Sequence, residues 1–424
     1  MAGIAVLGAQ WGDEGKGKAT DYLSRQIDYV VKFNGGNNAG HTVVIDEKHF
    51  ALHLLPSGIL TDEVQAVIGN GAVIDIVALF DELDQLKDAG VDDSRLVISS
   101  KAHILTLYHK ALDKAKEHSL GSKKIGTTGK GIGPAYADKI SRLGIQAADL
   151  LSDAGLRAKI QTALDYNNFL LTDLYGKPAM TVQQVIDEFA PYLERIKPMI
   201  KDVPLLLTNA LAEGKTVLFE ASQGALLDID FGTYPFVTSS NTISAGIGTG
   251  AGIPVRSIDR VVGVAKAYLT RVGNGPFPTE QDNDIGELIR TRGAEVGVTT
   301  GRTRRCGHYD AVLARYSNMI NGFTDMILTK LDVLTGFDKI PVCVAYKLRG
   351  KVSENMPLSL LDLDAVEPVY EMLPGWKEDI TKARHFADLP MAAKKYVSFI
   401  EQVTNVKVSA IGVGPAREDI VVKE

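Results

Sequence analysis

The sequence predicts an α/β fold in which a large, mostly parallel central sheet is flanked by helices. In the first hundred residues, short apolar runs typical of strands alternate with segments of helical periodicity, which is the pattern of a parallel sheet covered by helices. The first apolar run leads directly into a glycine-rich loop, as in the nucleotide-binding folds related to P-loop NTPases. The middle of the chain, residues 101–214, has mainly helical periodicity and indicates an insertion.

The expected elements follow from these periodicities in chain order. We expect strands over residues 4–7, 28–33, 64–68, 95–99, 216–219, 261–268, 326–329, 342–348, 407–411 and 420–422. We expect helices over residues 19–25, 75–89, 103–117, 153–174, 181–200 and 205–212. The chain then divides into a nucleotide-binding core (1–100), a mostly helical insertion (101–214), the rest of the core (215–268) and a C-terminal α+β part (269–424).

Composition excludes several classes of protein. The 424 residues carry a net charge of −6, which disfavours binding to the backbone of nucleic acids. No apolar run approaches the roughly 18 residues of a membrane span, and the N-terminus lacks the pattern of a secretory signal. Cys306 and Cys343 have no spacing typical of a disulfide framework or a metal site. We therefore expect a cytoplasmic protein with free thiols, bound neither to membranes nor to nucleic acids.

The glycine-rich loop at residues 8–18 follows the apolar run 4–7 and precedes the expected helix 19–25. Glycines allow backbone N–H groups to surround an anion, and the N-terminus of a helix adds partial positive charge, so this loop is a candidate phosphate site. It departs from the Walker pattern, because six residues separate Gly8 from the Gly15-Lys16 pair and Gly17 replaces the usual Ser or Thr.

Two carboxylates, Asp13 and Glu14, lie inside this loop. A carboxylate beside phosphate is repulsive unless a cation lies between them or the carboxylate accepts a proton from a substrate. Either reading makes the loop a functional site. The alternative is an ordinary surface turn rich in Gly, Asp and Lys.

A second glycine-rich loop, residues 35–42, follows the expected strand 28–33. Loops that leave the carboxyl ends of neighbouring parallel strands face the same crevice, so His41 could approach Asp13. An imidazole and a carboxylate that converge on one substrate form an acid–base pair. A solvated histidine in a polar turn is the alternative.

Two further polar loops are candidates for ligand contacts. Residues 126–134 combine four glycines with two threonines and Lys130, which suits a second phosphate, and Arg142 follows shortly. Residues 220–224 and 238–242 carry amides and hydroxyls that either bind base and sugar atoms or satisfy buried backbone groups in a long loop.

The C-terminal part contains a basic stretch and a possible guanine site. Residues 298–305 hold three arginines, whose guanidinium groups match carboxylates and phosphates; a solvated basic turn is the alternative. Residues 329–332 (TKLD) follow an expected strand and are close to the guanine-reading signature of GTPases. The Asp332 carboxylate can accept two hydrogen bonds from guanine, and the stem of Lys330 can lie along the base.

Taken together, the motifs resemble those of the adenylosuccinate synthetase family over essentially the whole chain. The matching segments are 11–18 (WGDEGKGK), 35–42 (GGNNAGHT), 126–136 (GTTGKGIGPAY), 239–242 (SSNT), 270–280 (TRVGNGPFPTE), 329–334 (TKLDVL) and 374–376 (PGW). The resemblance implies a ligase that joins IMP and L-aspartate with GTP and Mg²⁺, through a 6-phosphoryl intermediate, in the synthesis of AMP. It also implies a homodimer in which Arg142 reaches the neighbouring active site.

The resemblance assigns roles to particular residues. Asp13 would be the general base and a magnesium ligand, Gly40 would supply a carbonyl to the magnesium, His41 would act as the acid, and Gln223 would complete the catalytic group. The GTP contacts would be Gly12, Asp13, Glu14, Gly15, Lys16, Gly17, Lys18, Gly40, His41, Thr42, Arg304, Lys330, Leu331, Asp332, Gly412, Val413 and Gly414. The IMP contacts would be Asp13, Glu14, Gly15, Lys16, Asn38, Ala39, Gly40, His41, Thr128, Arg142, Gln223, Thr238 and Arg302. The loop over aspartate would be Val298, Thr299, Thr300, Gly301, Arg302, Thr303 and Arg304.

Some positions depart from the family pattern. Gly412-Val413-Gly414 stands where many members have Ser-Thr-Gly, Thr303 interrupts a run of arginines, and His308 replaces a common Trp. A regulatory GTPase and a nucleotide kinase are the alternative functions. The missing hydroxyl after Lys16, the two loop carboxylates and the additional polar loops argue against a GTPase switch.

Overall fold

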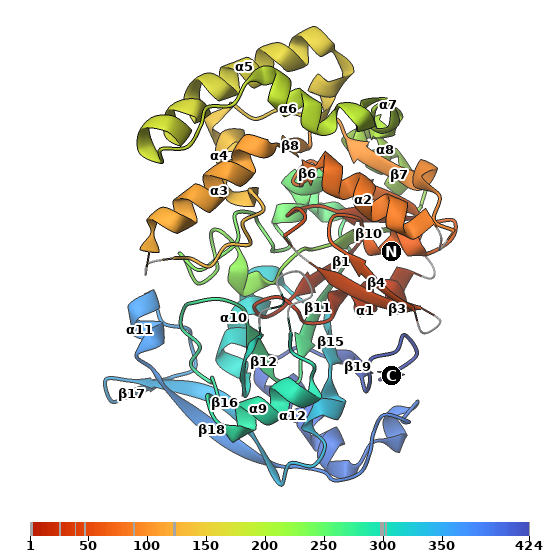
Figure 1. Cartoon of the computed structure of the whole chain (residues 1–424). Helices are drawn as coiled ribbons and strands as arrows, with labels where there is room; N and C mark the ends of the chain where they lie inside the picture. Colours follow the sequence, from red (N-terminus) through yellow and green to blue (C-terminus); the bar gives the residue numbers. More distant parts are fainter. Residues whose placement is uncertain are drawn as a thin grey trace.

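The structure is a computed structural model that describes residues 3–24, 27–38, 40–45, 48–87, 90–121, 124–296, 301 and 303–423, with only the backbone described for 41–51. Its main feature is a ten-stranded sheet with the order β20-β19-β15-β11-β1-β10-β2-β5-β7-β9 within the described chain. All neighbouring pairs are parallel except β19 and β20. The fold class expected from the sequence is therefore confirmed (Figure 1).

The strands of this sheet lie close to their expected positions, except β9, which was not expected because residue 200 was placed in a helix. They are β1 (Gly3–Gly8), β2 (Tyr29–Lys32), β5 (Gln65–Ile68), β7 (Leu96–Ser99), β9 (Ile200–Lys201), β10 (Val217–Glu220), β11 (Arg260–Lys266), β15 (Asp325–Thr329), β19 (Val408–Gly412) and β20 (Ile420–Val422). In β1, the side chains of Ala5, Val6 and Leu7 are fully buried, because helices cover both faces of a parallel sheet. Ala5 pairs with Phe219 on one side and Val261 on the other, which places the strand before the phosphate loop near the centre of the sheet.

The six expected helices are present in whole or in part, whereas α4, α9, α10, α11 and α12 were not expected from the sequence. The helices are α1 (Lys16–Leu23), α2 (Ile76–Leu86), α3 (Leu107–Ser119), α4 (Ile132–Ser141), α5 (Asp153–Phe169), α6 (Val182–Phe189), α7 (Leu193–Ile196), α8 (Val203–Ala212), α9 (Asp284–Arg292), α10 (Ala311–Asn321), α11 (Leu360–Asp364) and α12 (Met391–Thr404). The helix expected over 181–200 is broken into short turns around Pro191 and Pro198, because proline cannot donate the helical hydrogen bond. Residues 103–105 form strand β8 before α3 begins, capped by Thr106.

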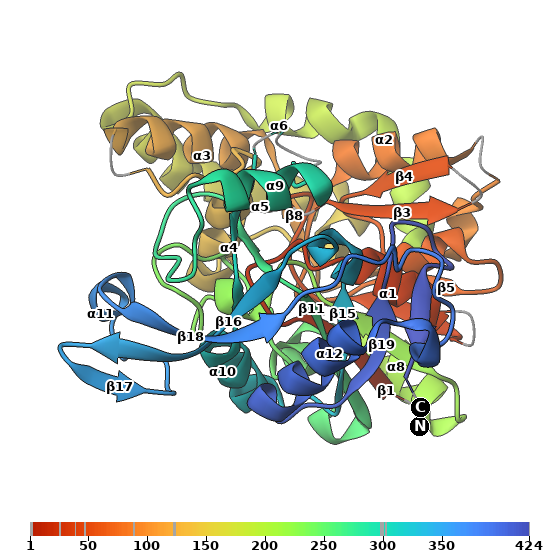
Figure 2. The same cartoon turned by 90° about the horizontal axis from the view of Figure 1, so that it is seen from below.

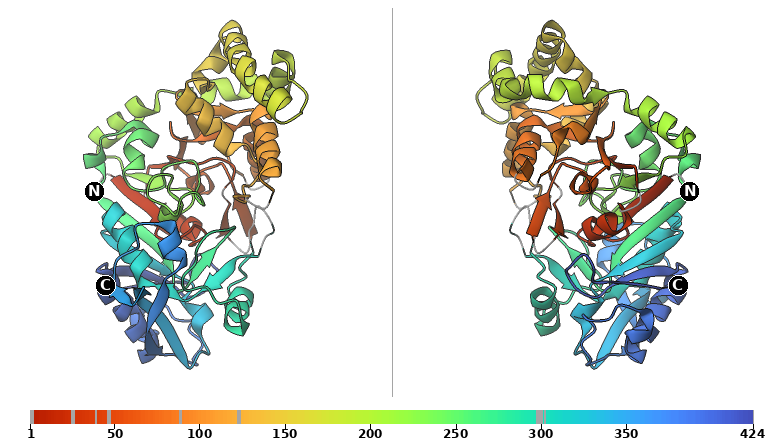
Figure 3. Two further views of the ribbon diagram at one scale, coloured as in Figure 1. Left: turned by 90° about the vertical axis from the view of Figure 1, so that its left-hand side faces the viewer. Right: turned by 90° about the vertical axis from the view of Figure 1, so that its right-hand side faces the viewer.

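The segment 101–214 lies at one end of the molecule, and α3 to α7 lie together there (Figures 1 and 3). Its apolar side chains, among them Leu156, Ile160 and Phe189, belong to a separate core cluster that also includes Leu79 of α2. The chain returns to the central sheet through β9, which pairs with β7 at the edge. The division of the chain into four parts remains a prediction.

A second sheet lies in the C-terminal part and contains β14 (Tyr309–Asp310), β16 (Lys339–Leu348), β17 (Lys351–Ser353) and β18 (Glu367–Pro374) (Figure 2). The expected strand 342–348 is part of β16 and thus belongs to this sheet and not to the central one. Three small pairs complete the fold: β3 (His41–Ile45) with β4 (Lys48–Leu52), β6 (Val73–Asp75) with β8 (His103–Leu105), and β12 (Leu269–Arg271) with β13 (Arg305–Gly307). Within the described ranges, no helix has the length and apolar character needed to span a membrane.

Candidate active site

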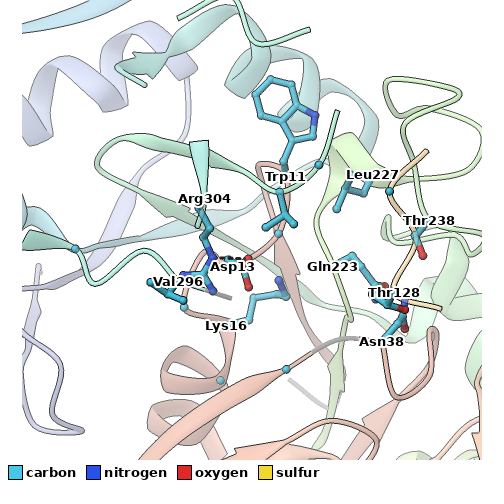
Figure 4. Close-up of a pocket in the computed structure, with 18 of the residues that line it drawn as sticks. Trp11, Asp13, Lys16, Asn38, Thr128, Gln223, Leu227, Thr238, Val296 and Arg304 are labelled. Carbon is cyan, nitrogen blue, oxygen red and sulfur yellow. Dashed lines mark hydrogen bonds and ion pairs between the residues drawn. The ribbon is translucent and has the colours of Figure 1, made fainter. Parts of the chain in front are cut away.

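A cavity of about 710 Å³ opens at the carboxyl ends of the central strands, where ligands bind in open parallel sheets. Its volume falls in the usual range of small-molecule sites, ~300–1,000 Å³. Loops after β1, β2, β10, β11 and β15 contribute to its wall, so segments far apart in sequence meet there (Figure 4). The residues assigned from the sequence that line it are Gly12, Asp13, Gly15, Lys16, Gly17, Lys18, Asn38, Gly40, Thr128, Gln223, Thr238, Arg304, Lys330, Asp332, Gly412 and Gly414.

The phosphate loop takes a tight left-handed path before α1. Gly12 and Gly15 have φ angles of 83° and 89°, which glycine adopts at little cost. Asp13 also has a positive φ, 59°, which is uncommon for a residue with a side chain. Lys16 then begins α1, so the partial positive charge of the helix N-terminus adjoins the cavity.

The two loop carboxylates point in different directions. Glu14 is fully buried, and its Oε1 accepts hydrogen bonds from the backbone N–H groups of Gln10 (3.1 Å) and Gly12 (2.8 Å). Its Oε2 lies 2.6 Å from the Nζ of Lys16, which is also buried. Glu14 thus holds the loop together from inside, whereas Asp13 lines the cavity with a side chain that is 29% exposed. The sequence could not distinguish the two, because they are adjacent and chemically alike.

Arg304 is the direct partner of Asp13. Its Nε donates to Asp13 Oδ2 at 2.8 Å, as Figure 4 shows, and its Nη1 donates to Glu295 Oε2 at 2.7 Å. Burial alone would lower the pKa of Arg304, but the two carboxylates raise it above its usual value. The guanidinium is therefore charged and bridges Asp13, in the loop after β1, to Glu295, in the segment before residue 297.

Glu295 was not identified from the sequence, although it is the centre of a buried ion cluster. Its carboxylate accepts from Lys266 Nζ (3.0 Å), Lys330 Nζ (2.9 Å) and Tyr268 Oη (2.5 Å), in addition to Arg304. Burial would raise the pKa of Glu295, but the three cations lower it well below its usual range. The available signal was Lys266, a charged residue at the end of an apolar strand, where a buried lysine needs a carboxylate partner.

One end of the cavity presents amide and hydroxyl groups, and the amide of Gln223 is unpaired. Gln223 has a φ of 59°, and both its Oε1 and its Nε2 are buried without a hydrogen-bond partner. A buried amide left without partners is costly unless a ligand satisfies it. Thr128, Asn38 and Thr238 lie around it in Figure 4. This end suits a polar ligand with several donors and acceptors.

The cavity wall also contains Asp332, whose Oδ1 is likewise buried without a partner. Burial raises the pKa of this carboxyl, with Lys18 and Lys330 acting in the opposite direction. Lys18 is tied to the same wall, because its Nζ donates to the carbonyls of Gly414 (2.7 Å) and Asp419 (3.0 Å). The stem of Lys330 starts from a left-handed backbone conformation, φ 57°. This part of the wall therefore offers a free carboxylate oxygen to a ligand with N–H groups.

Other assigned residues lie away from the cavity or outside the described residues. Leu331 and Val413 are fully buried in the core, while Arg142, Gly301 and Thr303 are exposed, and none of these five is in the cavity wall. The assigned residues that lie outside the described ones are Ala39, Val298, Thr299, Thr300 and Arg302, together with the side chains of His41 and Thr42. The wall also contains residues that were not assigned, including Asp113, Val272, Gly273, Asn274, Arg292, Gly293, Ala294 and Pro415.

The comparisons with known proteins agree over nearly the whole chain. Residues 5–421 match the family described as adenylosuccinate synthetase. The adenylosuccinate synthetase of Acidothermus cellulolyticus is 57% identical over 99% of both chains, and that of Leifsonia xyli is 56% identical over 100% of this chain and 97% of the relative. The solved structure of a fully ligated adenylosuccinate synthetase from Plasmodium falciparum has a TM-score of 0.94 and 42% identity, over 99% of each chain. The chain therefore belongs to the adenylosuccinate synthetase family.

Proposed function

We propose that this chain is a GTP-dependent carbon–nitrogen ligase that joins IMP and L-aspartate and releases adenylosuccinate, GDP and phosphate. Family membership supports this reaction in purine synthesis. The observation that carries it is one cavity whose wall contains Asp13 together with two residues, Gln223 and Asp332, that each have buried polar side-chain atoms without a hydrogen-bond partner. Two different ligands that meet at a carboxylate require this arrangement, whereas one nucleotide does not.

In the proposed mechanism Asp13 accepts the proton from the ring nitrogen of IMP. The purine oxygen then attacks the γ-phosphate of GTP, and GDP leaves. The amino group of aspartate next attacks C6 of the 6-phosphoryl intermediate, which forms the carbon–nitrogen bond, displaces inorganic phosphate and releases a proton. Arg304 orients the Asp13 carboxylate by a hydrogen bond to one oxygen, which leaves the other oxygen for the substrate. Lys16 and the loop N–H groups hold the phosphates, and His41 donates a hydrogen bond to the phosphoryl group in transfer.

We assign the end of the cavity around Gln223, Asn38, Thr128 and Thr238 to IMP, because the unpaired amide of Gln223 and the nearby hydroxyl groups suit a base and a ribose phosphate. The part of the wall with Lys330 and Asp332 is assigned to guanine. The residues 298–304 are assigned to aspartate.

Magnesium is the cofactor that we propose, held by Asp13 and the carbonyl of Gly40. Among the described residues there is no group of three or more His, Cys, Asp or Glu side chains suited to a metal. One carboxylate (Asp13) and one backbone carbonyl (Gly40) fit Mg²⁺, which is usually bound by one or two carboxylates together with substrate phosphates. When bound, the ion would reduce the repulsion between Asp13 and the phosphates. We also propose a cytoplasmic location, since both cysteines are free and buried.

A coupled assay tests the reaction. The purified chain should consume GTP only when IMP and L-aspartate are both present, with the absorbance change of adenylosuccinate formation. Omitting either substrate is the control. GTP hydrolysis without IMP would indicate a regulatory GTPase, and phosphoryl transfer to a nucleotide without aspartate would indicate a kinase; either result would contradict the proposal.

A further inference from the structure

We propose that Glu295 is a positioning residue that sets the places of Arg304 and Lys330 together and so controls the affinity for GTP and L-aspartate. This inference rests on the proposed function. It concerns a residue outside every motif quoted above, and it follows from the way one buried carboxylate holds side chains from different loops.

The contacts of Glu295 divide between its two oxygens. Oε2 accepts from Arg304 Nη1 at 2.7 Å, while Oε1 accepts from Lys330 Nζ at 2.9 Å and from Lys266 Nζ at 3.0 Å. Tyr268 Oη donates to Oε1 as well, at 2.5 Å. Each oxygen thus fixes one side chain of the cavity wall, and Glu295 itself is fully buried behind that wall.

On one side, Glu295 and Arg304 flank the segment 297–302. The backbone N–H of Arg304 donates to the carbonyl of Glu295 at 3.0 Å, and Val296 forms a bridge with Thr303. Backbone and side-chain contacts therefore join the two ends of this segment at the same point. Because residues 298–304 are assigned to aspartate, a displaced Arg304 should weaken the binding of that substrate.

On the other side, Lys330 leaves the end of β15 with a left-handed backbone and its ammonium group turns to Glu295 and the carbonyl of Gly293 (2.6 Å). This contact fixes the lysine stem next to Asp332, where guanine is assigned. Loss of the Glu295 charge should therefore lower the affinity for GTP. Among the described residues, the side-chain partners of Glu295 are Arg304, Lys330, Lys266 and Tyr268 and do not include Gln223, Asn38, Thr128 or Thr238, so the KM for IMP should change least.

The alternative is that the cluster only stabilises the fold. A buried carboxylate among three cations is costly to remove in either case, since the cations then lack a partner. Stability alone cannot separate the two roles. The KM values of the three substrates can separate the two roles, because a fold defect would change all three, whereas a positioning role would change only those for GTP and aspartate.

The experiment compares Glu295→Gln with Asp325→Asn. Asp325 accepts from Arg260 Nε (2.9 Å) and Nη2 (2.6 Å) at the amino ends of β15 and β11, the same two strands whose carboxyl ends carry Lys330 and Lys266. In Glu295→Gln we expect the KM for GTP and for aspartate to rise about tenfold or more, with the KM for IMP within about threefold. Asp325→Asn should leave all three KM values unchanged. Equal rises for all substrates, or no rise in a folded variant, would overturn the proposal.

A double variant separates position from charge. Glu295→Gln/Lys266→Met removes one negative and one positive charge, so the cluster keeps its net charge, and Lys266 is fully buried outside the cavity wall. We expect the double variant to recover melting temperature while the two KM values stay raised. Recovery of the KM values would show that net charge matters and the position set by Glu295 does not.

Titration of a non-hydrolysable GTP analogue measures affinity without turnover. If wild-type protein binds the analogue but makes no adenylosuccinate, the proposed function fails while the role of Glu295 in GTP binding can still be measured. Unchanged binding in both Glu295 variants would overturn that role.

Discussion

At the scale of residues, the site depends on the directions in which two adjacent carboxylates point. The sequence placed Asp13 and Glu14 in a phosphate loop, but their separate environments arise from the backbone path, in which Asp13 takes a positive φ and Glu14 turns inward to Lys16. The same holds for the unpaired groups of Gln223 and Asp332. Their types were predictable from motifs, whereas their burial without partners depends on long-range packing.

Asp13→Asn should abolish turnover while the affinity for GTP stays within about tenfold of wild type. The amide cannot accept the proton of IMP, whereas the loop N–H groups that hold phosphate are unchanged. Losing a general base costs ~10²–10⁴-fold, so the rate should be at or below about 1% of wild type. Steady-state rates and calorimetric titration with GTP measure the two quantities.

Glu14→Gln provides the contrast to this variant. It keeps Asp13 but removes the charge that pairs with Lys16 inside the loop, so we expect GTP binding and thermal stability to fall together.

Turnover of Asp13→Asn above about 1% would contradict the role of Asp13 as base.

Asp332→Asn should change the preference for the phosphoryl donor from GTP toward XTP. In the proposed guanine site the carboxylate accepts from the ring N–H and amino groups of guanine, whereas an amide in its place offers one acceptor and presents N–H groups to those donors. Losing a charge-assisted hydrogen bond costs about 1.5–3 kcal/mol. Xanthine has an oxygen where guanine has its amine, so the amide can donate there. The ratio of kcat/KM for XTP over GTP measures the change.

The KM values for IMP and aspartate serve as the internal control for Asp332→Asn and should move little. An unchanged ratio of XTP to GTP would mean that Asp332 does not read the base.

At the scale of elements, the sequence predicted most strands of the central sheet because each is a short apolar run followed by a polar loop. It failed for the helix expected over 181–200, which Pro191 and Pro198 interrupt. Strand 342–348 was expected and is part of β16, but its apolar character, which is like that of the central strands, did not indicate that it pairs in a second sheet. Pairing partners are set by tertiary packing, which periodicity does not encode.

Gly224→Ala should disrupt the phosphate loop from the neighbouring element. A Cβ at this position would lie 2.3 Å from Glu14 Oε1, 2.4 Å from the carbonyl of Gln10 and 2.6 Å from the N of Gly12, so either the loop after β1 or the loop after β10 must move. We expect at least about 1–3 kcal/mol of destabilisation, together with weaker GTP binding. Chemical unfolding and calorimetric titration give both values.

Gly155→Ala is the control for this substitution. Gly155 lies in the first turn of α5, where its Cβ would be 3.3 Å from the Ser152 hydroxyl, and alanine favours a helix. Its effect on GTP binding should be absent. Equal behaviour of the two variants would show that the packing of Gly224 against Glu14 is not needed for the loop.

At the scale of the whole molecule, one cavity is assembled from loops of the core and from the C-terminal part, while the helices of 101–214 extend to one side (Figure 3). The sequence indicated these loops individually, because each is rich in glycine or charge. Glu295 was not indicated, because its role arises only when β11, β15 and the segment before residue 297 meet. The role of Arg142 is also not visible in a single chain, because this residue is assigned to bind IMP in the active site of the neighbouring subunit.

Arg142 ends α4 with a φ of 66° and is exposed, and within the described chain its guanidinium has no hydrogen bond or ion pair. We propose a homodimer in which this side chain binds IMP in the neighbouring subunit. Mixing Arg142→Leu chains with Asp13→Asn chains should then restore activity, because one site of each mixed dimer contains both intact residues. At equal amounts, with random exchange, about half of the dimers are mixed, so roughly a quarter of the wild-type activity is expected, in line with independent sites.

Each variant alone is the control and should be nearly inactive at low IMP concentration, and subunit exchange is checked by native mass spectrometry. No recovery in the mixture, despite confirmed exchange, would mean that Arg142 serves its own subunit or no site.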